Sequence, residues 1–165
     1  MRRAWMRRAV IAAFVLAFGC VTISCLAQQT AERKILFVCE HGNVKSLMAA
    51  SYFNQNIREF NLPYRAVARG SAPDSTTVPA AIVQGLEHDG IDVSAFQPAK
   101  VSASDIASPA RIILIGTSLP AGLRASSKAR IEQWNDIPAA SVDFEAARES
   151  LRKHVRELIA QLPRR

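Results

Sequence analysis

Residues 35–46 of this chain read ILFVCEHGNVKS. The apolar run at the start is typical of a buried strand, and Cys39 falls where that strand passes into a loop. We expect a helix from Lys45 onward, so a short loop joins the two elements. In an open α/β sheet the carboxyl ends of the strands face the crevice where ligands bind. This pattern therefore places the Cys39 thiol at a functional edge.

The residues after Cys39 are suited to bind an anion. Gly42 and Asn43 tolerate left-handed backbone conformations, which turn successive N–H groups inward. The first N–H groups of the following helix have no intrahelical acceptor and add to the same positive field. Lys45 contributes a full positive charge. We therefore predict a cradle for a phosphate-like oxyanion.

The same cradle would stabilise negative charge on the Cys39 sulfur. Ser46 could donate its hydroxyl to the sulfur and favour the charged form further. A reactive thiolate is therefore our first interpretation of this position. The alternative is a strand-end cysteine that only packs as a small apolar residue.

Around this stretch, short apolar runs alternate with helical patterns, which indicates strand-helix units on a parallel sheet. We predict an α/β fold in a single domain: an open, mainly parallel, four-stranded sheet with helices on both faces. The expected strands cover residues 34–38, 64–68, 111–115 and 130–134, with a brief extended segment at 91–93. The expected helices cover residues 45–59, 78–89 and 144–162, and residues 116–128 form a polar loop. The last helix should turn one apolar face inward, made of Ala147, Leu151, Val155, Leu158 and Leu162.

Composition and charge are those of an ordinary globular protein. The chain has 165 residues, of which 49% are hydrophobic, enough to form a core. The formal net charge is +7, but four of the 21 basic residues lie in the first eight positions. The other 17 basic residues face 14 acidic ones, which leaves +3. This balance gives no reason to expect a nucleic-acid partner.

Residues 1–27 have the pattern of a secretory signal peptide: a basic start, an apolar run and small residues up to Ala27. We expect cleavage there, export to the periplasm and a functional domain over residues 28–165. An uncleaved N-terminal membrane anchor is the alternative, and the membrane is a partner only in that case. A lipoprotein cut before Cys20 or Cys25 is a further possibility. Cleavage after Ala27 would leave Cys39 as the one remaining cysteine.

At these residues the chain resembles the low-molecular-weight protein tyrosine phosphatases and the thiol-dependent arsenate reductases that share their fold. Their signature is an apolar strand, Cys, five residues, Arg, and Ser or Thr. Here the same spacing reads Cys39, five residues, Lys45 and Ser46. Residues 69–71 are similar to the small-residue loop of that family, and residues 85–93 to its helix-to-strand passage.

This resemblance implies roles for individual residues. Cys39 would be the nucleophile that attacks phosphorus and forms a phosphocysteine, and Lys45 would stand in the position of the signature Arg. Asp136, before Pro138, would protonate the leaving group, although Ile137 separates it from that proline. Asp143 fits a helix-capping role better. The substrate-binding cradle would comprise Glu40, His41, Gly42, Asn43, Val44 and Ser46.

The cradle contains two titratable side chains. His41 either contacts the substrate or is a solvated loop residue. Glu40 is expected to point outward, because a carboxylate repels a phosphate group. His88 and His154 lie on predicted helices without metal-ligand spacing, so we predict no metal site and no cofactor.

Lys45 is the main departure from the family pattern. An ammonium group lacks the planar fork with which a guanidinium holds two phosphate oxygens. The resemblance therefore implies a phosphatase acting on a phosphorylated protein or a small oxyanion, with slow turnover. One alternative is an arsenate reductase that borrows an external thiol, since no cysteine follows Cys39. Another is a non-catalytic module that binds oxyanions.

Overall fold

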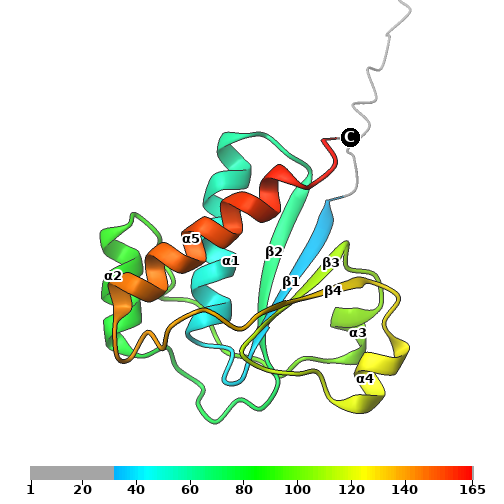
Figure 1. The fold of residues 1–165 in the computed structure, drawn as a ribbon. Coiled ribbons are helices and arrows are strands. Elements are labelled where there is room, and N and C mark those ends of the chain that lie inside the picture. Colours follow the sequence, from blue (N-terminus) through cyan, green and yellow to red (C-terminus); the bar gives the residue numbers. More distant parts are fainter. Residues whose placement is uncertain (1–31, 165) are drawn as a thin grey trace, which may run out of the picture.

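The computed structural model describes residues 32–164, and the predicted signal peptide, residues 1–27, lies outside them. Figure 1 shows four strands and five helices that alternate along much of this part of the chain. The strands are β1 (Arg33–Cys39), β2 (Tyr64–Gly70), β3 (Arg111–Ile115) and β4 (Arg130–Trp134). The helices are α1 (Lys45–Glu59), α2 (Ala80–His88), α3 (Ala103–Ile106), α4 (Ala121–Ser126) and α5 (Phe144–Ala160).

The four strands form one open sheet in the order β2-β1-β3-β4, and all three pairings are parallel. The chain passes from β1 to β2 on one side and later returns to β3 on the other side of β1. The order of the strands therefore reverses at β1, and ligand sites of open α/β sheets form at such a switch point. Cys39 is the last residue of β1 and faces that crevice. The predicted fold class is confirmed.

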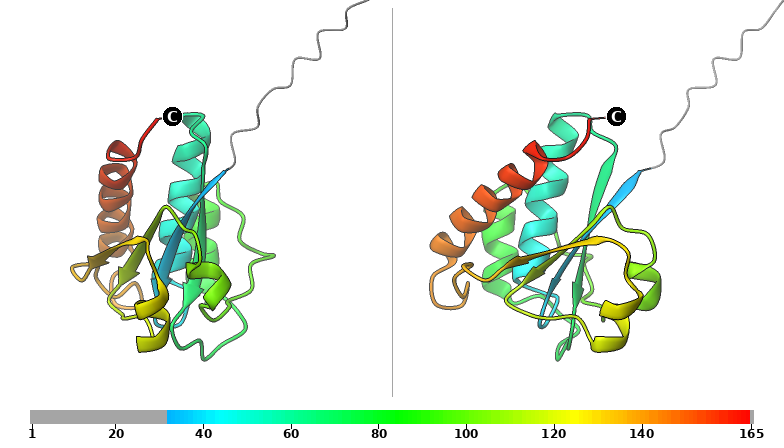
Figure 2. Two further views of the ribbon diagram at one scale, coloured as in Figure 1. Left: turned by 90° about the vertical axis from the view of Figure 1, so that its right-hand side faces the viewer. Right: turned by 45° about the vertical axis from the view of Figure 1, so that its right-hand side comes forward.

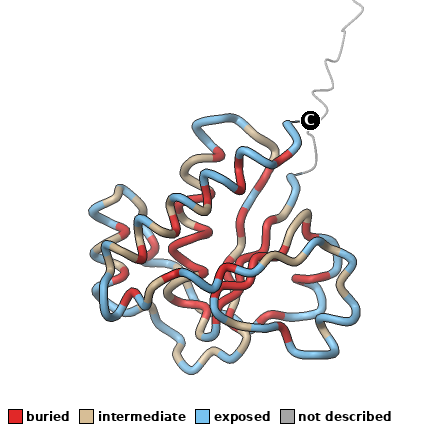
Figure 3. Tube along the Cα trace, in the orientation of Figure 1, coloured by how far each residue is buried: buried red, intermediate tan, exposed pale blue. Residues whose placement is uncertain are grey.

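The two faces of the sheet are covered by different helices. Ile35 and Phe37 of β1 belong to a large core with α1, α2 and α5, whereas Leu36 and Val38 belong to a smaller one. Because side chains alternate along a strand, these neighbours point to opposite faces. Figure 2 shows α1 and α5 on one side of the sheet and α3 and α4 on the other. The strands run through the buried interior in Figure 3.

The sequence predicted several elements to the residue. The bounds of α1, β3 and β4 are those expected, and all five residues predicted to face inward from the last helix are buried. Helix α5 itself ends at Ala160, two residues before the predicted end at residue 162. Helix α2 begins at Ala80 because Pro79, with ψ 137°, still has an extended backbone.

Two short helices were not predicted. The brief segment 91–93, predicted to be extended, pairs with no strand in the described part of the chain. The polar loop 116–128 contains α4, and α3 was not expected at all. Helix α3 has four residues, and a capping box between Ser102 and Asp105 holds its first turn. Such a short helix depends on its cap and its packing more than on periodicity.

The Asp105 carboxylate also ties α3 to the sheet. It accepts hydrogen bonds from the backbone N–H and the hydroxyl of Ser102, at 3.0 and 2.7 Å. The Arg69 guanidinium of β2 lies 3.1 Å from its other oxygen. Burial raises the pKa of Asp105, but the Ser102 hydrogen bonds and Arg69 together outweigh it, so the pKa lies below its usual value.

This lowered pKa predicts acid sensitivity. A carboxylate whose pKa is lower in the folded state contributes stability above the pKa of the unfolded chain, and loses it as the pH falls through the folded value. We expect the free energy of unfolding of the wild type to fall more steeply below about pH 4 than that of Asp105→Asn. Urea unfolding at a series of pH values measures both slopes. Parallel curves would contradict the assignment.

Candidate functional site

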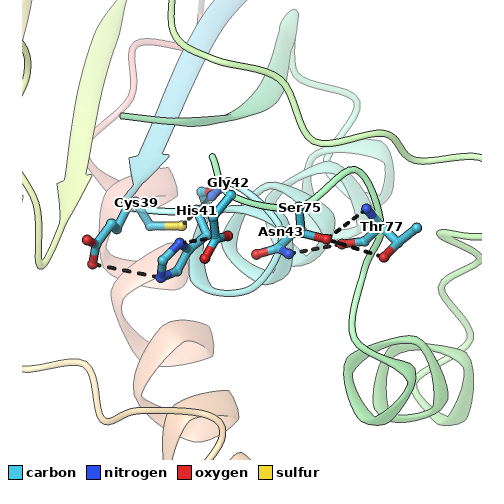
Figure 4. A network of polar contacts seen from close by, with 9 residues as sticks. Cys39, His41, Gly42, Asn43, Ser75 and Thr77 are labelled. Atoms are coloured by element: carbon cyan, nitrogen blue, oxygen red, sulfur yellow. Dashed lines mark hydrogen bonds and ion pairs between the residues drawn. The ribbon is translucent and has the colours of Figure 1, made fainter. Parts of the chain in front are cut away.

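The Cys39 sulfur lies at the carboxyl end of β1 with two polar neighbours. The Ser46 hydroxyl oxygen is 3.1 Å from the sulfur, and the Gly42 backbone N–H donates to it over 3.3 Å (Figure 4). The residue is 5% exposed and belongs to the core, yet it also lines a cavity. The Gly42 N–H is a donor to the sulfur, and the Ser46 hydroxyl lies within hydrogen-bond distance of it. This geometry favours the reactive interpretation of Cys39.

The segment between β1 and α1, residues 40–44, is called the thiol loop below. Its shape depends on a close approach to the end of β2. Gly42 has φ +82°, and a Cβ there would lie 2.6 Å from the backbone nitrogen of Gly70. A Cβ on Gly70 would in turn lie 2.7 Å from the His41 carbonyl oxygen. Only glycine fits at either position, so these two residues set the path of the thiol loop.

Asn43 has a different role from the one expected. Gly42 has a positive φ, but Asn43 is not among the described residues with a left-handed backbone. Its side chain is buried, and its amide nitrogen donates to the Thr77 carbonyl at 2.9 Å. Asn43 therefore ties the thiol loop to residues 71–79, as Figure 4 shows.

The backbone N–H groups of the predicted cradle are available. The first intrahelical bond of α1 runs from the Met48 N–H to the Val44 carbonyl, at 2.8 Å. In residues 32–164 no backbone acceptor pairs with the N–H groups of Asn43 or Val44, and Val44 provides no side-chain cap. Unpaired N–H groups at a helix N-terminus are a binding site for anions. These N–H groups are therefore free to bind a ligand, and the oxyanion cradle stays a prediction.

The Lys45 ammonium group lies on the wall of the cavity rather than free in solvent. Its Nζ donates to the Ile137 carbonyl at 2.9 Å. This bond joins the first residue of α1 to the segment between β4 and α5. A Cβ built on Gly116, the residue after β3, would lie 3.9 Å from the same nitrogen. Lys45 therefore lines the same cavity as Cys39 and links the start of α1 to the segment between β4 and α5.

The cavity at this edge has a volume of about 530 Å³. Five of the predicted site residues line it: Cys39, Glu40, His41, Val44 and Lys45. Sequence reasoning did not identify the rest of the wall, which is mostly apolar and comes from α2, β3 and the segment after β4. These residues are Pro79, Ala81, Ile82, Ile115, Gly116, Ala139, Ala140 and Ser141. The one sequence signal for them was that Ile115 ends a predicted parallel strand.

The structure does not bring Asp136 into this cavity. Its carboxylate is exposed and lies 3.2 Å from Nε2 of His154, on α5. Asp136 is not among the lining residues, so its role as the acid stays a prediction. Asp143 has the capping role expected, because its carboxylate accepts from the Ala146 N–H at 2.9 Å at the start of α5.

The described residues contain neither a cluster of metal-binding side chains nor a membrane-spanning helix. No group of three or more His, Cys, Asp or Glu side chains in residues 32–164 is placed to hold a metal ion. None of the helices over the same range is both long and apolar enough to cross a bilayer.

The described fold is that of the low-molecular-weight tyrosine phosphatases and related arsenate reductases. The low-molecular-weight protein tyrosine phosphatase from T. tengcongensis is 20% identical, with a TM-score of 0.68 over 79% of this chain and 99% of that one. The drosophila arginine phosphatase is 19% identical, with a TM-score of 0.66 over 77% of this chain and 96% of that one. The arsenate reductase from Archaeoglobus fulgidus is 20% identical, with a TM-score of 0.58 over 77% and 99%. At these identities the likeness establishes a shared fold.

Comparison with protein-family models gives no match, and comparison with curated proteins gives none. The resemblance seen in the sequence is therefore confirmed by structure, through solved proteins whose sequences differ at about four positions in five.

The contact between Gly42 and Gly70 predicts a severe effect of Gly42→Ala. An alanine there would require a disfavoured φ, at a cost of about 1–2 kcal/mol, and would collide with the β2 backbone. We expect inorganic phosphate to protect Cys39 from iodoacetamide at least tenfold less effectively in this variant. Gly122→Ala on α4, where a Cβ meets nothing within 4 Å, is the matched control and should behave like the wild type. Equal protection in both variants would refute the cradle.

Proposed function

We propose that this protein hydrolyses phosphate monoesters through a phosphocysteine on Cys39. The observation that carries the proposal is the position of the sulfur, which lies beside the Gly42 N–H and the Ser46 hydroxyl at the wall of an open cavity. Solved phosphatases that share this fold support it. A thiolate beside an oxyanion cradle is the arrangement needed for covalent phosphoryl transfer.

The reaction would proceed in two displacements. The phosphate group would bind with its oxygens on the N–H groups of the thiol loop and the first turn of α1. The thiolate of Cys39 would attack phosphorus, forming the S–P bond as the P–O bond to the leaving group breaks. Water would then attack the phosphocysteine and release inorganic phosphate. Lys45 would balance the negative charge of the transferring group, provided that it leaves the Ile137 carbonyl.

The walls of the cavity define the substrate class that we propose. The cradle would bind the phosphate end, while Val44, Ile82, Ile115 and three alanines form an apolar surface beside it. Such a surface suits the hydrocarbon part of a monoester, whether on a phosphorylated protein or a small molecule. Glu40 is among the lining residues, and its side chain is exposed, consistent with its predicted outward orientation.

Arsenate reduction is the second candidate, because solved arsenate reductases share the fold. Arsenate is a tetrahedral oxyanion like phosphate, so the same cradle would accept it. Cys39 is the one cysteine in residues 32–164, and none follows it in the sequence. The reductant would therefore have to be an external thiol. A non-catalytic oxyanion-binding module is the remaining alternative.

Export to the periplasm is also our proposal, and it rests on residues 1–27 alone. The described fold begins with β1 at Arg33, so cleavage after Ala27 would remove none of it. N-terminal sequencing of the protein from fractionated cells tests this. A mature form that starts at Met1 in the membrane fraction would favour the anchor instead.

Replacing the nucleophile gives the first functional prediction. We expect Cys39→Ser to abolish phosphate release from an aryl phosphate and to prevent trapping of a phosphoenzyme in acid. A parallel assay with arsenate and dithiothreitol measures arsenite. Phosphate release that persists in the variant would overturn the phosphatase proposal, and arsenite formation by the wild type alone would favour the reductase. If neither reaction occurs but phosphate still protects Cys39 from alkylation, the binding module is favoured.

Replacing Lys45 gives the second functional prediction. A guanidinium in its place would supply two parallel hydrogen bonds to phosphate oxygens, and one such donor is worth roughly a hundredfold or more in rate. We expect Lys45→Arg to raise kcat on an aryl phosphate by tenfold or more. Lys153→Arg, at an exposed position on α5, is the matched control. An unchanged kcat would mean that residue 45 does not contact the transferring group.

A further inference from the structure

The side chain of His41, in the thiol loop, has no role in the two displacements described above. Its backbone is held where the loop crosses β2, since its carbonyl oxygen lies against Gly70. Its imidazole is half-exposed and lines the same cavity as Cys39. A titratable ring thus lies in the site, on a backbone that is fixed by the neighbouring strand.

Two carboxylates flank the imidazole on different sides. Oδ1 of Asp74 lies 3.0 Å from Nδ1, and Oε2 of Glu40 lies 3.8 Å from Nε2. Nδ1 is buried and makes no hydrogen bond within residues 32–164, so its contact with Asp74 is electrostatic. The distance to Glu40 is too long for a hydrogen bond, so Nε2 stays available. A carboxylate beside one ring nitrogen favours one orientation of the ring electrostatically and leaves the other nitrogen to exchange protons.

The other lining residues are less suited to move a proton. The Lys45 ammonium is bonded to the Ile137 carbonyl and is needed for its charge. Glu40 carries a carboxylate, which repels a phosphate dianion, whereas an imidazolium attracts it. Asp136 lies outside the cavity in an ion pair with His154. His41 combines a position on the cavity wall with a ring nitrogen, Nε2, that makes no hydrogen bond within residues 32–164.

We propose that His41 is the catalytic acid and base of this site and that Asp74 is its positioning residue. This inference rests on the proposed phosphatase function. In the first displacement the proton on Nε2 passes to the leaving oxygen as the P–O bond breaks, giving an alcohol and the phosphocysteine. In the second, the neutral Nε2 takes a proton from the attacking water as the new P–O bond forms. The S–P bond breaks, the thiolate returns, and phosphate leaves with the ring protonated again.

The experiment compares two substrates with the full chain. Dinitrophenyl phosphate releases a stable anion that needs no proton, whereas phenyl phosphate releases a basic one that does. We expect His41→Gln to lose roughly a hundredfold or more in kcat/KM on phenyl phosphate and less than fivefold on dinitrophenyl phosphate. For Asp74→Asn we expect a smaller loss of kcat/KM, which is again greater on phenyl phosphate than on dinitrophenyl phosphate. His88→Gln, at an exposed position on α2, is the control for a histidine outside the site.

The second displacement gives a separate readout. Without a base, hydrolysis of the phosphocysteine should become limiting, so His41→Gln should show a burst of dinitrophenol and accumulate phosphoenzyme. A His41→Ala variant should regain activity on phenyl phosphate when imidazole is added, which a merely structural role would not give. Equal losses on both substrates, without a burst or rescue, would overturn the assignment.

A parallel Asp136→Asn variant separates this inference from the alternative acid. If that variant shows the leaving-group-dependent loss and His41→Gln does not, Asp136 is the acid and our assignment is wrong. The proposed function fails in a different way, when the wild type releases no phosphate or Cys39→Ser retains its activity. That result would remove the reaction, and the role of His41 in it would fall as well.

Discussion

The site depends on one steric constraint: the thiol loop crosses the carboxyl end of β2 at backbone contact distance. Gly42 and Gly70 meet there, and neither has room for a Cβ. The crossing is held by two hydrogen bonds, from the Ser71 N–H to the Cys39 carbonyl and from the Ala72 N–H to the Glu40 carbonyl, each 2.8 Å long. In the loop fixed in this way, the Gly42 N–H donates to the Cys39 sulfur, while the N–H groups of Asn43 and Val44 have no backbone acceptor within residues 32–164.

Charged and apolar side chains both line the cavity. Lys45, at the N-terminus of α1, and His41, which two carboxylates flank, contribute to the same wall as the Cys39 sulfur. Most of the other lining residues are apolar. In the proposed reaction, the loop N–H groups and Lys45 would compensate the charge of the phosphate group, and the rest of a monoester would lie against hydrocarbon.

Away from the site, a second polar cluster joins α1 and α5 to the residue that follows α2. The buried Asp89 carboxylate accepts from the Tyr52 hydroxyl at 2.8 Å, and the guanidinium groups of Arg148 and Arg152 lie 3.1 and 3.3 Å away. Burial and the nearby Asp89 raise the pKa of Tyr52, so its hydroxyl stays protonated. The helices that support the thiol loop are therefore cross-linked by charge as well as by apolar packing.

The sequence determined the periodic elements and the position of the thiol, because both follow from local patterns. An apolar run specifies β3 to the residue, the short strand β4 also has the predicted bounds, and the order Cys, loop, helix places Cys39 at the end of β1. Short helices such as α3 could not be predicted in this way, since a cap and tertiary packing stabilise them. Tertiary structure alone decided that Asp74 lies beside His41, that Lys45 bonds to Ile137, and that Asp136 pairs with His154. These contacts join segments up to 92 residues apart, and no local preference specifies which loops meet.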